Sequence, residues 1–125
     1  MSSSDEHLLR FIAASFPSVW ALELLLALKR ERRLWTSAEL LASLRASELV
    51  ISKALDALVA AGLVSVEESG ARYLPVTGDV DRCVEQVEEL YRSRPNKVRR
   101  AIISASASSA IAFADAFKLR RDENG

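Results

Sequence analysis

Residues 45–64 read RASELVISKALDALVAAGLV, and this stretch is the most informative about the fold. Ile51, Leu55 and Leu58 are spaced three and four residues apart, which places them on one face of a helix. Gly62 stands where a left-handed C-terminal cap is expected. The stretch therefore predicts an amphipathic helix whose buried face includes these three apolar residues.

A second helix is predicted just before this one. Thr36 is followed three residues later by Glu39, which is the signature of a capping box ahead of an apolar run. We expect this helix to cover residues 37–44. After a tight break, Ser47 is a good N-cap for the longer helix, which should run to about Ala61.

A β-hairpin is predicted after the longer helix. The stretch LVSV (63–66) favours a strand, ESG (68–70) is a turn signal, and RYLPV (72–76) indicates a return strand. Pro75 should mark the end of that strand or the edge of a sheet. The order helix, turn, helix, hairpin is typical of winged helix-turn-helix proteins, whose second helix enters the DNA major groove.

The stretch TSAELLASLRASELVISKALDALVAAGLVSVEESGARYLP (36–75) resembles the winged-helix DNA-binding region of MarR-type and related bacterial transcriptional regulators. The closest matching pieces are ISKALDALVAAGLV (51–64) and the short wing VEESGARYLPV (66–76), and the resemblance covers residues 18–78. It implies a mainly α fold with a three-helix core, a β-hairpin wing, and flanking N- and C-terminal helices. It also implies a homodimer formed by the terminal helices.

The resemblance divides the chain into three parts. Residues 1–17 would be an N-terminal helical arm, residues 18–78 the winged helix-turn-helix domain, and residues 79–125 C-terminal helices that form a dimerisation region. The small-residue stretch SASASSA (104–110) is either a weak point in one long helix or a join between two. Helical spacing resumes after it, from Ile111 onward.

The exposed positions of the longer helix and the wing give the candidate DNA contacts. Serine hydroxyls can bond phosphates or base edges, lysine can bond phosphate or guanine, and arginine suits phosphate or the minor groove. The predicted DNA-binding residues are Arg45, Ser47, Glu48, Ser52, Lys53, Asp56 and Arg72. Their partner would be double-stranded DNA, and the expected function is that of a transcriptional regulator, a repressor acting as a homodimer.

Acidic and apolar residues on the same surface favour an alternative. Glu48 and Asp56 oppose the phosphate field, and Glu67 and Glu68 would repel DNA if the wing presented them. Leu49 or Val50 could touch a thymine methyl group from an exposed position. The other interpretation is that one of the two is simply buried. The alternative function is a winged-helix protein-interaction module, a regulatory adaptor that does not bind DNA.

Composition narrows the remaining function classes. The 17 Lys and Arg balance the 17 Asp and Glu, so any attraction to nucleic acid must come from a local patch. One cysteine and one histidine do not form a metal site or a catalytic pair, and no glycine-rich phosphate loop occurs. We therefore expect neither an enzyme nor a cofactor, and Cys83 is interpreted as structural, with a redox sensor as the alternative.

Two further features bear on location and on charge clusters. The longest apolar stretch, SVWALELLLALK (18–29), is interrupted by Glu23 and is too short to span a bilayer, so we expect no membrane partner. A single cysteine, which allows no internal disulfide, and the acidic, polar start MSSSDEHLLR (1–10) indicate a cytoplasmic protein. The clusters KRERR (29–33) and residues 92–100 could approach phosphate, but they are also typical of solvated helix ends.

Overall fold

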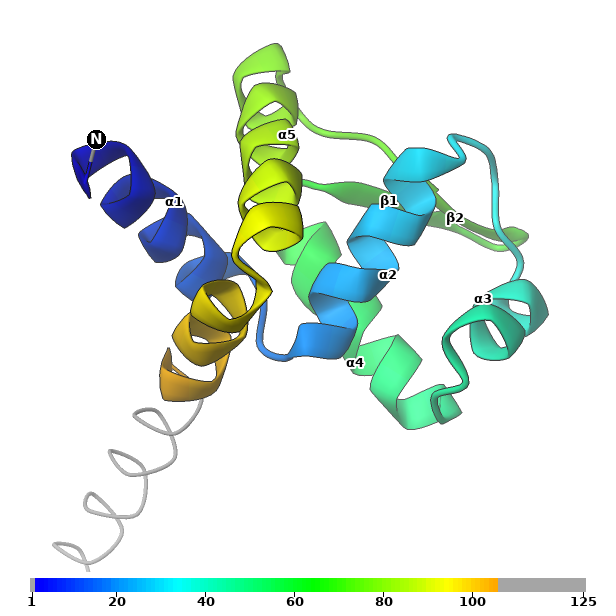
Figure 1. Cartoon of the computed structure of the whole chain (residues 1–125). Helices are drawn as coiled ribbons and strands as arrows, with labels where there is room; N and C mark the ends of the chain where they lie inside the picture. Colours follow the sequence, from blue (N-terminus) through cyan, green and yellow to red (C-terminus); the bar gives the residue numbers. More distant parts are fainter. Residues whose placement is uncertain (1, 106–125) are drawn as a thin grey trace, which may run out of the picture.

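The computed structural model describes residues 2–105, which fold into a mainly helical protein with one small antiparallel sheet (Figure 1). A helix over residues 95–105 follows the last named element. The elements in chain order are α1 (Ser2–Ser15), α2 (Val19–Arg30), α3 (Ser37–Leu44), α4 (Glu48–Ala60), β1 (Val64–Glu67), β2 (Gly70–Tyr73) and α5 (Gly78–Ser93). The predictions for residues 106–125, including the helical spacing from Ile111, lie outside the described residues.

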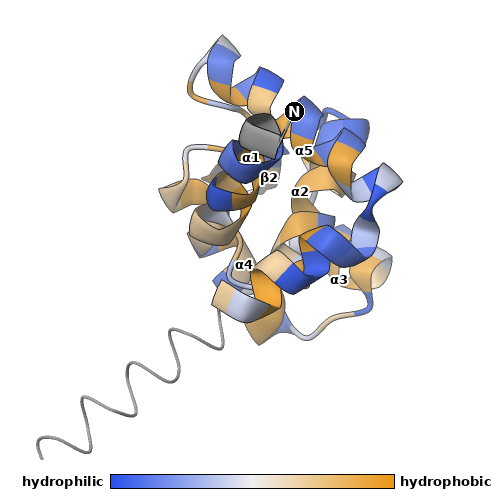
Figure 2. Ribbon diagram, turned by 60° about the vertical axis from the view of Figure 1, so that its left-hand side comes forward, coloured by the Kyte–Doolittle hydropathy of each residue, from blue (hydrophilic) through white to orange (hydrophobic). Residues whose placement is uncertain are grey.

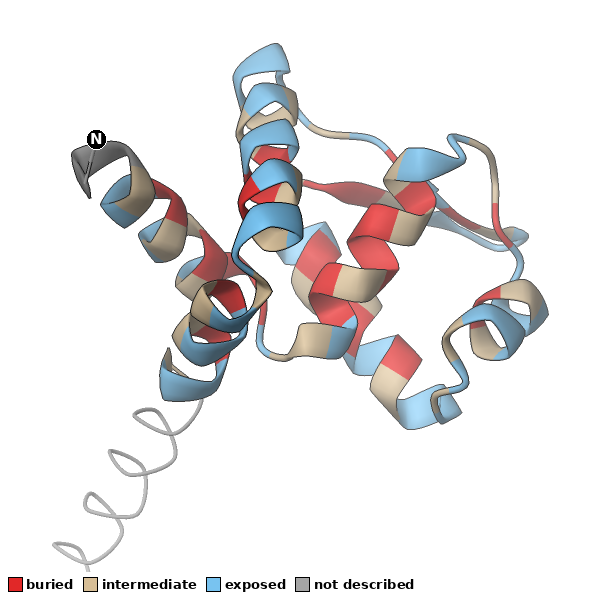
Figure 3. Ribbon diagram, viewed as in Figure 1, coloured by how far each residue is buried: buried red, intermediate tan, exposed pale blue. Residues whose placement is uncertain are grey.

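The central element is α2, which packs against α4, β2 and α3. Its apolar arc is wide, and its leucines are fully buried, as the red segments of Figure 3 show. These side chains are Leu22, Leu24, Leu25, Leu26 and Leu28. The helix with the most large apolar residues therefore forms the centre of the core.

The two helices predicted around residues 37–60 are present. Thr36 Oγ1 accepts a hydrogen bond from the Glu39 backbone N–H at 3.2 Å, and Glu39 Oε1 accepts one from the Thr36 N–H at 3.0 Å. The predicted capping box is thus confirmed, and α3 has the predicted bounds. Ser47 is the N-cap of α4, also as predicted.

One residue of the predicted core face of α4, Leu55, lies at the edge of the core rather than inside it. Ile51 and Leu58 are buried as expected, but Leu55 is only half-buried. Ala54 takes the inner position instead, because α2 packs on the side of α4 that carries Ile51, Ala54 and Leu58. Leu55 lies one step around the helix, towards α3.

The hairpin pairs Val64 with Tyr73 and Glu67 with Gly70. The backbone of Trp35 adds a third, one-residue strand to it: its N–H donates to the Ala71 carbonyl at 2.7 Å, and its carbonyl accepts from the Ala71 N–H at 2.8 Å. This bridge, which the sequence analysis did not predict, ties the start of α3 to the hairpin.

The helices at the two ends of the described chain lie on the same side of α2. α1 contacts α5, and Lys97 in the 95–105 helix forms an ion pair with Asp5 of α1 at 3.2 Å. Figure 2 shows hydrophilic and hydrophobic residues alternating along α5, and its apolar residues Val84 and Val87 are buried. Ile12 of α1 joins the same core.

No single helix within the described residues is long and apolar enough to cross a membrane. Asp5–Ser15 and Val19–Arg30 meet the length and composition criteria only as a pair, and the pair is bent by 102°. The leucines of α2 are covered by the rest of the protein, whereas Trp20, near the start of the helix, is 47% exposed.

Gly70 provides a test of the bridge between Trp35 and the hairpin. Its φ of +152° disfavours other residues, and an added Cβ would overlap the Trp35 carbonyl oxygen. We expect Gly70→Ala to lower the free energy of unfolding by about 2 kcal/mol or more, measured by urea denaturation. Gly78→Ala is the matched control, because its Cβ would meet only Arg82 Nη1 at 3.8 Å. Equal stability of the two variants would contradict this view of the bridge.

Glu39 makes the stability depend on pH. A hydrogen bond from Arg33, followed by those from Thr36, lowers the pKa of Glu39 from 4.5 to about 2. Its ionised form therefore stabilises the fold above pH 4.5, and this contribution is lost as the pH falls from 4.5 towards 2. Glu39→Gln keeps a capping-box residue but removes the charge. Urea denaturation at a series of pH values should show a shallower loss of stability for the variant below pH 4.5; identical curves would contradict the assignment.

Candidate nucleic-acid interface

All seven predicted contact residues are exposed, and they lie on or next to α4 and on the hairpin. Arg45 ends α3 with a left-handed φ of 51°, and its N–H donates to the Leu41 carbonyl at 2.9 Å. This residue turns the chain from α3 into α4. Arg72 lies on β2, so the hairpin and the α3–α4 turn each supply one arginine.

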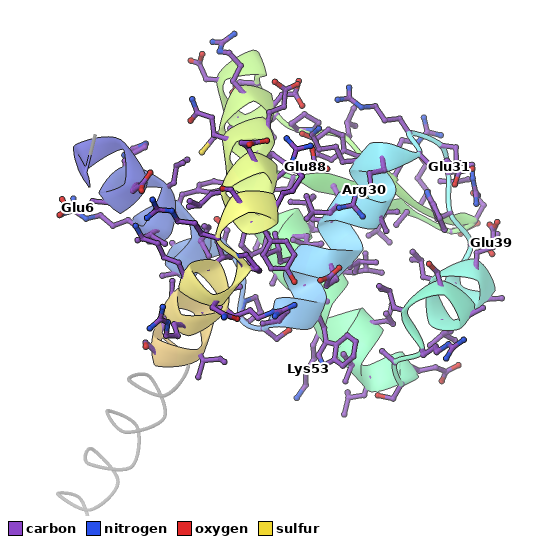
Figure 4. All side chains as sticks on the ribbon, viewed as in Figure 1. Glu6, Arg30, Glu31, Glu39, Lys53 and Glu88 are labelled. Carbon is purple, nitrogen blue, oxygen red and sulfur yellow. The ribbon has the colours of Figure 1, made fainter. Side chains whose placement is uncertain are left out.

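The outward face of α4 carries two neighbouring rows of side chains. Glu48, Ser52 and Asp56 are four residues apart and form one row, and Leu49 and Lys53 form the next. In Figure 4 the Lys53 side chain extends from α4 away from the body of the protein. The arrangement places the one cation of this helix on the row farther from α3.

The choice between Leu49 and Val50 is settled by their exposure. Leu49 is 63% exposed, whereas Val50 is half-buried. A large apolar side chain thus stands beside Lys53 on the outer face of α4. It can contact a thymine methyl group or an apolar side chain of a partner.

The two serines of this face differ in what their hydroxyls do. Ser47 Oγ accepts a hydrogen bond from the Val50 backbone N–H at 3.2 Å and thereby caps α4. The Ser52 hydroxyl has no hydrogen-bond partner among the described residues. Ser52 is therefore free for a ligand, while Ser47 has a structural role in the unliganded protein.

The charge of the hairpin is partly neutralised within it. Arg72 Nε lies 3.4 Å from Glu67 Oε1, and both side chains are about half exposed. An exposed pair of this kind stabilises the protein by about 1 kcal/mol or less, so a phosphate could displace Glu67. Glu68 lies at the exposed turn of the hairpin.

A groove of about 500 Å³, which the sequence patterns do not predict, lies between α3, α4 and β1. Glu48, Ser52 and Asp56 line it together with apolar side chains. The apolar lining consists of Leu41, Ile51, Leu55, Val59 and Val66. The available signal was the set of apolar residues that the core does not use: Val59 is 45% exposed and Val66 is 52% exposed.

The cations of the KRERR cluster (29–33) form ion pairs with carboxylates of the same protein. Lys29 Nζ and Arg30 Nε lie 3.0 and 3.4 Å from the Glu88 carboxylate on α5, and Figure 4 shows Arg30 and Glu88 facing each other. Arg32 pairs with Asp81 at 3.7 Å. These cations join α2 to α5, and a phosphate would have to compete with the carboxylates.

Arg33 is held in a similar way. It pairs with Glu39 at 2.9 Å, and its guanidinium lies 4.1 Å from the centroid of the Trp35 ring. Within residues 92–100, Arg92 pairs with Glu89, and Arg99 lies 5.6 Å from the Tyr91 ring centroid. The second basic cluster is therefore also partly engaged within the protein.

The surroundings of Cys83 agree with a structural role. The residue is half-buried, and burial raises the pKa of its thiol, so the reactive thiolate is disfavoured. His7 is exposed on α1. Within the described residues, no group of three or more histidine, cysteine, aspartate or glutamate side chains could hold a metal ion.

Comparison of the chain with protein-family models, with curated proteins and with solved structures finds no match.

The two serines of α4 provide a matched pair of variants. We expect Ser47→Ala to lower the free energy of unfolding by about 1 kcal/mol, because α4 loses its N-cap. Ser52→Ala should change stability by less than about 0.5 kcal/mol, since its hydroxyl has no partner. Chemical denaturation measures the stability of both variants. Equal losses of unfolding free energy would show that the Ser47 cap adds no more stability than the Ser52 hydroxyl.

Proposed function

We propose that this chain is a winged helix-turn-helix protein of the MarR-like type that binds double-stranded DNA as a transcriptional regulator. α3 and α4 would be the helix-turn-helix pair, α4 the recognition helix, and β1 and β2 the wing. The one-residue strand at Trp35 supports this assignment, because it fastens the wing to the helix pair. As a bacterial regulator, the protein would act in the cytoplasm.

The observation that carries this proposal is the outward face of α4. Ser52 and Lys53 are exposed at its centre, and neither side chain is engaged within the described protein. Arg45 stands before the helix and Arg72 on the adjacent hairpin. A recognition helix with a hydroxyl and a cation in the middle, flanked by arginines, suits base edges in the major groove and phosphates on either side.

The acidic residues limit the affinity of such an interface. The surface carries three cations and four carboxylates. The cations are Arg45, Lys53 and Arg72, and the carboxylates are those of Glu48, Asp56, Glu67 and Glu68. Three of the four are partly withdrawn from DNA. Glu67 is paired with Arg72, and Glu48 and Asp56 line the groove rather than the row of Lys53.

Two subunits would be needed for useful affinity. Three phosphate contacts per subunit give about six in a homodimer, and such a complex loses about 10³-fold in affinity between about 50 and 200 mM salt. A dimer that blocks its operator in this way would act as a repressor. We assign dimerisation to residues 79–125.

The groove favours a second candidate function. Its apolar lining and its carboxylates, next to the exposed Leu49, would suit a partner protein with apolar and basic side chains. On this alternative, the protein is an adaptor whose winged-helix domain binds another protein instead of DNA.

The two functions differ in how charge changes on α4 affect DNA binding. Lys53→Ala combined with Arg72→Ala should weaken DNA binding. The steepness with which log affinity falls against log salt concentration should decrease from about 5 to about 2. Glu48→Gln combined with Asp56→Asn should strengthen binding at low salt. Genomic DNA retained by the protein would be sequenced, and the affinity of a retained fragment measured by fluorescence anisotropy.

Arg30→Ala is the control, because it removes an arginine that is 63% exposed on α2, outside α4, the hairpin and the residues assigned to dimerisation. It should leave both affinity and salt slope unchanged. Sedimentation of each variant in the same buffer would separate lost DNA contacts from lost dimers, since the monomer has a mass of 13.7 kDa. The DNA proposal is wrong if the wild-type protein retains no genomic fragment at low salt.

A further inference from the structure

The groove between α3, α4 and β1 exposes apolar side chains that a partner would cover. Val59 and Val66 are about half exposed, and Leu55 is half-buried, although all three line the same groove. Covering apolar surface is favourable by about 25 cal/mol per Å². The groove therefore suits an apolar segment as its occupant.

The carboxylates of the groove specify the charge of that segment. Glu48 and Asp56 both line the groove and are exposed, and no cation of the described residues pairs with either. A segment with lysine or arginine beside its apolar residues would complement them.

A segment with this composition occurs near the end of the chain. Residues 111–121 read IAFADAFKLRR, with four large apolar side chains, three cations and a single acidic residue. The apolar residues are Ile111, Phe113, Phe117 and Leu119, and the cations are Lys118, Arg120 and Arg121. Both the apolar character and the net charge match the groove.

The described chain ends beside the C-terminal end of α4. Ala105 shares a hollow with Ala57, Ala60 and Ala61, at the C-terminal end of α4. The five residues 106–110 can span about 17 Å when extended, at about 3.3 Å per residue, and an α-helix with its side chains is about 10 Å across. Half the circumference of such a helix is about 16 Å, so the length of residues 106–110 matches the path around one side of α4.

We propose that residues 111–121 dock in the groove of their own chain. A short connection gives the segment an effective concentration of about 1 mM, so an intrinsic Kd of about 0.1 mM leaves the groove about 90% occupied. The docked segment lies over the row of Glu48, Ser52 and Asp56 and obstructs the α4 face. Docking itself does not require DNA binding, but its effect on DNA rests on the function proposed above.

A spin label tests the position of the segment in the full-length chain. Asn124→Cys in a Cys83→Ser background places a nitroxide just beyond the segment, and NMR of the methyl groups reports what lies near it. We expect paramagnetic broadening of Leu55, Val59 and Val66. Broadening that spares these three methyl-bearing residues would overturn the proposal.

Variants on both sides of the contact sharpen the result. Phe113→Ser with Phe117→Ser should abolish the broadening, and Glu48→Gln with Asp56→Asn should reduce it severalfold. Ile103→Ser is the matched control, because Ile103 is 59% exposed but precedes the segment. If the control removes the broadening as fully as the phenylalanine variant, the specific contact is refuted.

The occupant of the groove is identified by mixing two samples. Spin-labelled chains without isotope are added to isotope-labelled chains without a spin label, so that only contacts between copies cause broadening. We expect no broadening of the groove in this mixture. Broadening there would assign the groove to the segment of a second copy, and broadening in neither sample would leave the groove to a different protein; both results overturn docking within one chain.

DNA affinity distinguishes failure of this proposal from failure of the DNA proposal. Releasing a segment that occupies the groove about 90% of the time should raise DNA affinity about tenfold in the phenylalanine variant. If the methyl spectra show docking but the protein binds no DNA with or without the segment, docking stands and the DNA function is wrong. If DNA binds with unchanged affinity and the groove methyl groups are not broadened, docking is wrong and the DNA function stands.

Discussion

Trp35 holds the start of α3 against the hairpin, and the shape of the candidate interface depends on it. Its backbone exchanges two hydrogen bonds with Ala71, and its indole N–H donates to the Glu31 carbonyl at 2.9 Å. The residue is buried, with the Arg33 guanidinium stacked on its ring. Because Thr36 follows directly and caps α3, the position of the bridge determines where that helix begins. The bridge thereby holds α3, one wall of the groove between α3, α4 and β1, against the hairpin that carries another wall.

The distribution of ion pairs separates the scaffold from the candidate interface. On one side of α2, carboxylates of α5 neutralise Lys29, Arg30 and Arg32, and the pair between Lys97 and Asp5 joins the helices at the two ends of the described chain. These charges connect elements far apart in the sequence. On α4 itself, by contrast, Glu48, Lys53 and Asp56 have no ion-pair partner among the described residues, although Arg72 on the neighbouring hairpin pairs with Glu67. Such side chains keep their full charge available to a ligand, which makes the α4 face the best candidate for a binding surface.

Local sequence signals predicted the helices well because their causes are local. The Thr36 and Glu39 capping box determined the start of α3, and Ser47 and Gly62 marked the two ends of α4. The mainly helical fold and the hairpin followed from the same signals. The one-residue strand at Trp35 has no such local pattern, because α3 and α4 separate Trp35 from its partner Ala71 in the sequence.

The candidate site was predicted in part, and for a similar reason. Exposure of all seven predicted contacts followed from the helical period and the hairpin alternation. The groove did not, because helical spacing alone cannot tell whether α2 will cover Leu55 or Ala54. The partners of KRERR were equally hidden, since Glu88 and Asp81 approach it only through the packing of α5 on α2.

The two rows of side chains on α4 explain how one helix can serve two ligands that affect each other. Lys53 and Leu49 belong to the outer row, whereas Glu48 and Asp56 turn towards the groove. A ligand in the groove neutralises carboxylates that repel phosphate, yet it also adds bulk next to the row that would enter the major groove.

The sign of the coupling between the two ligands depends on which effect is larger. The size of the coupling must be the same in both directions: the factor by which a groove ligand changes DNA affinity is the factor by which DNA changes the affinity of that ligand. For a segment as large as IAFADAFKLRR, exclusion outweighs the neutralisation of two exposed carboxylates, because charge effects at an exposed surface are worth about 1 kcal/mol or less. The groove and the outer row are therefore expected to compete.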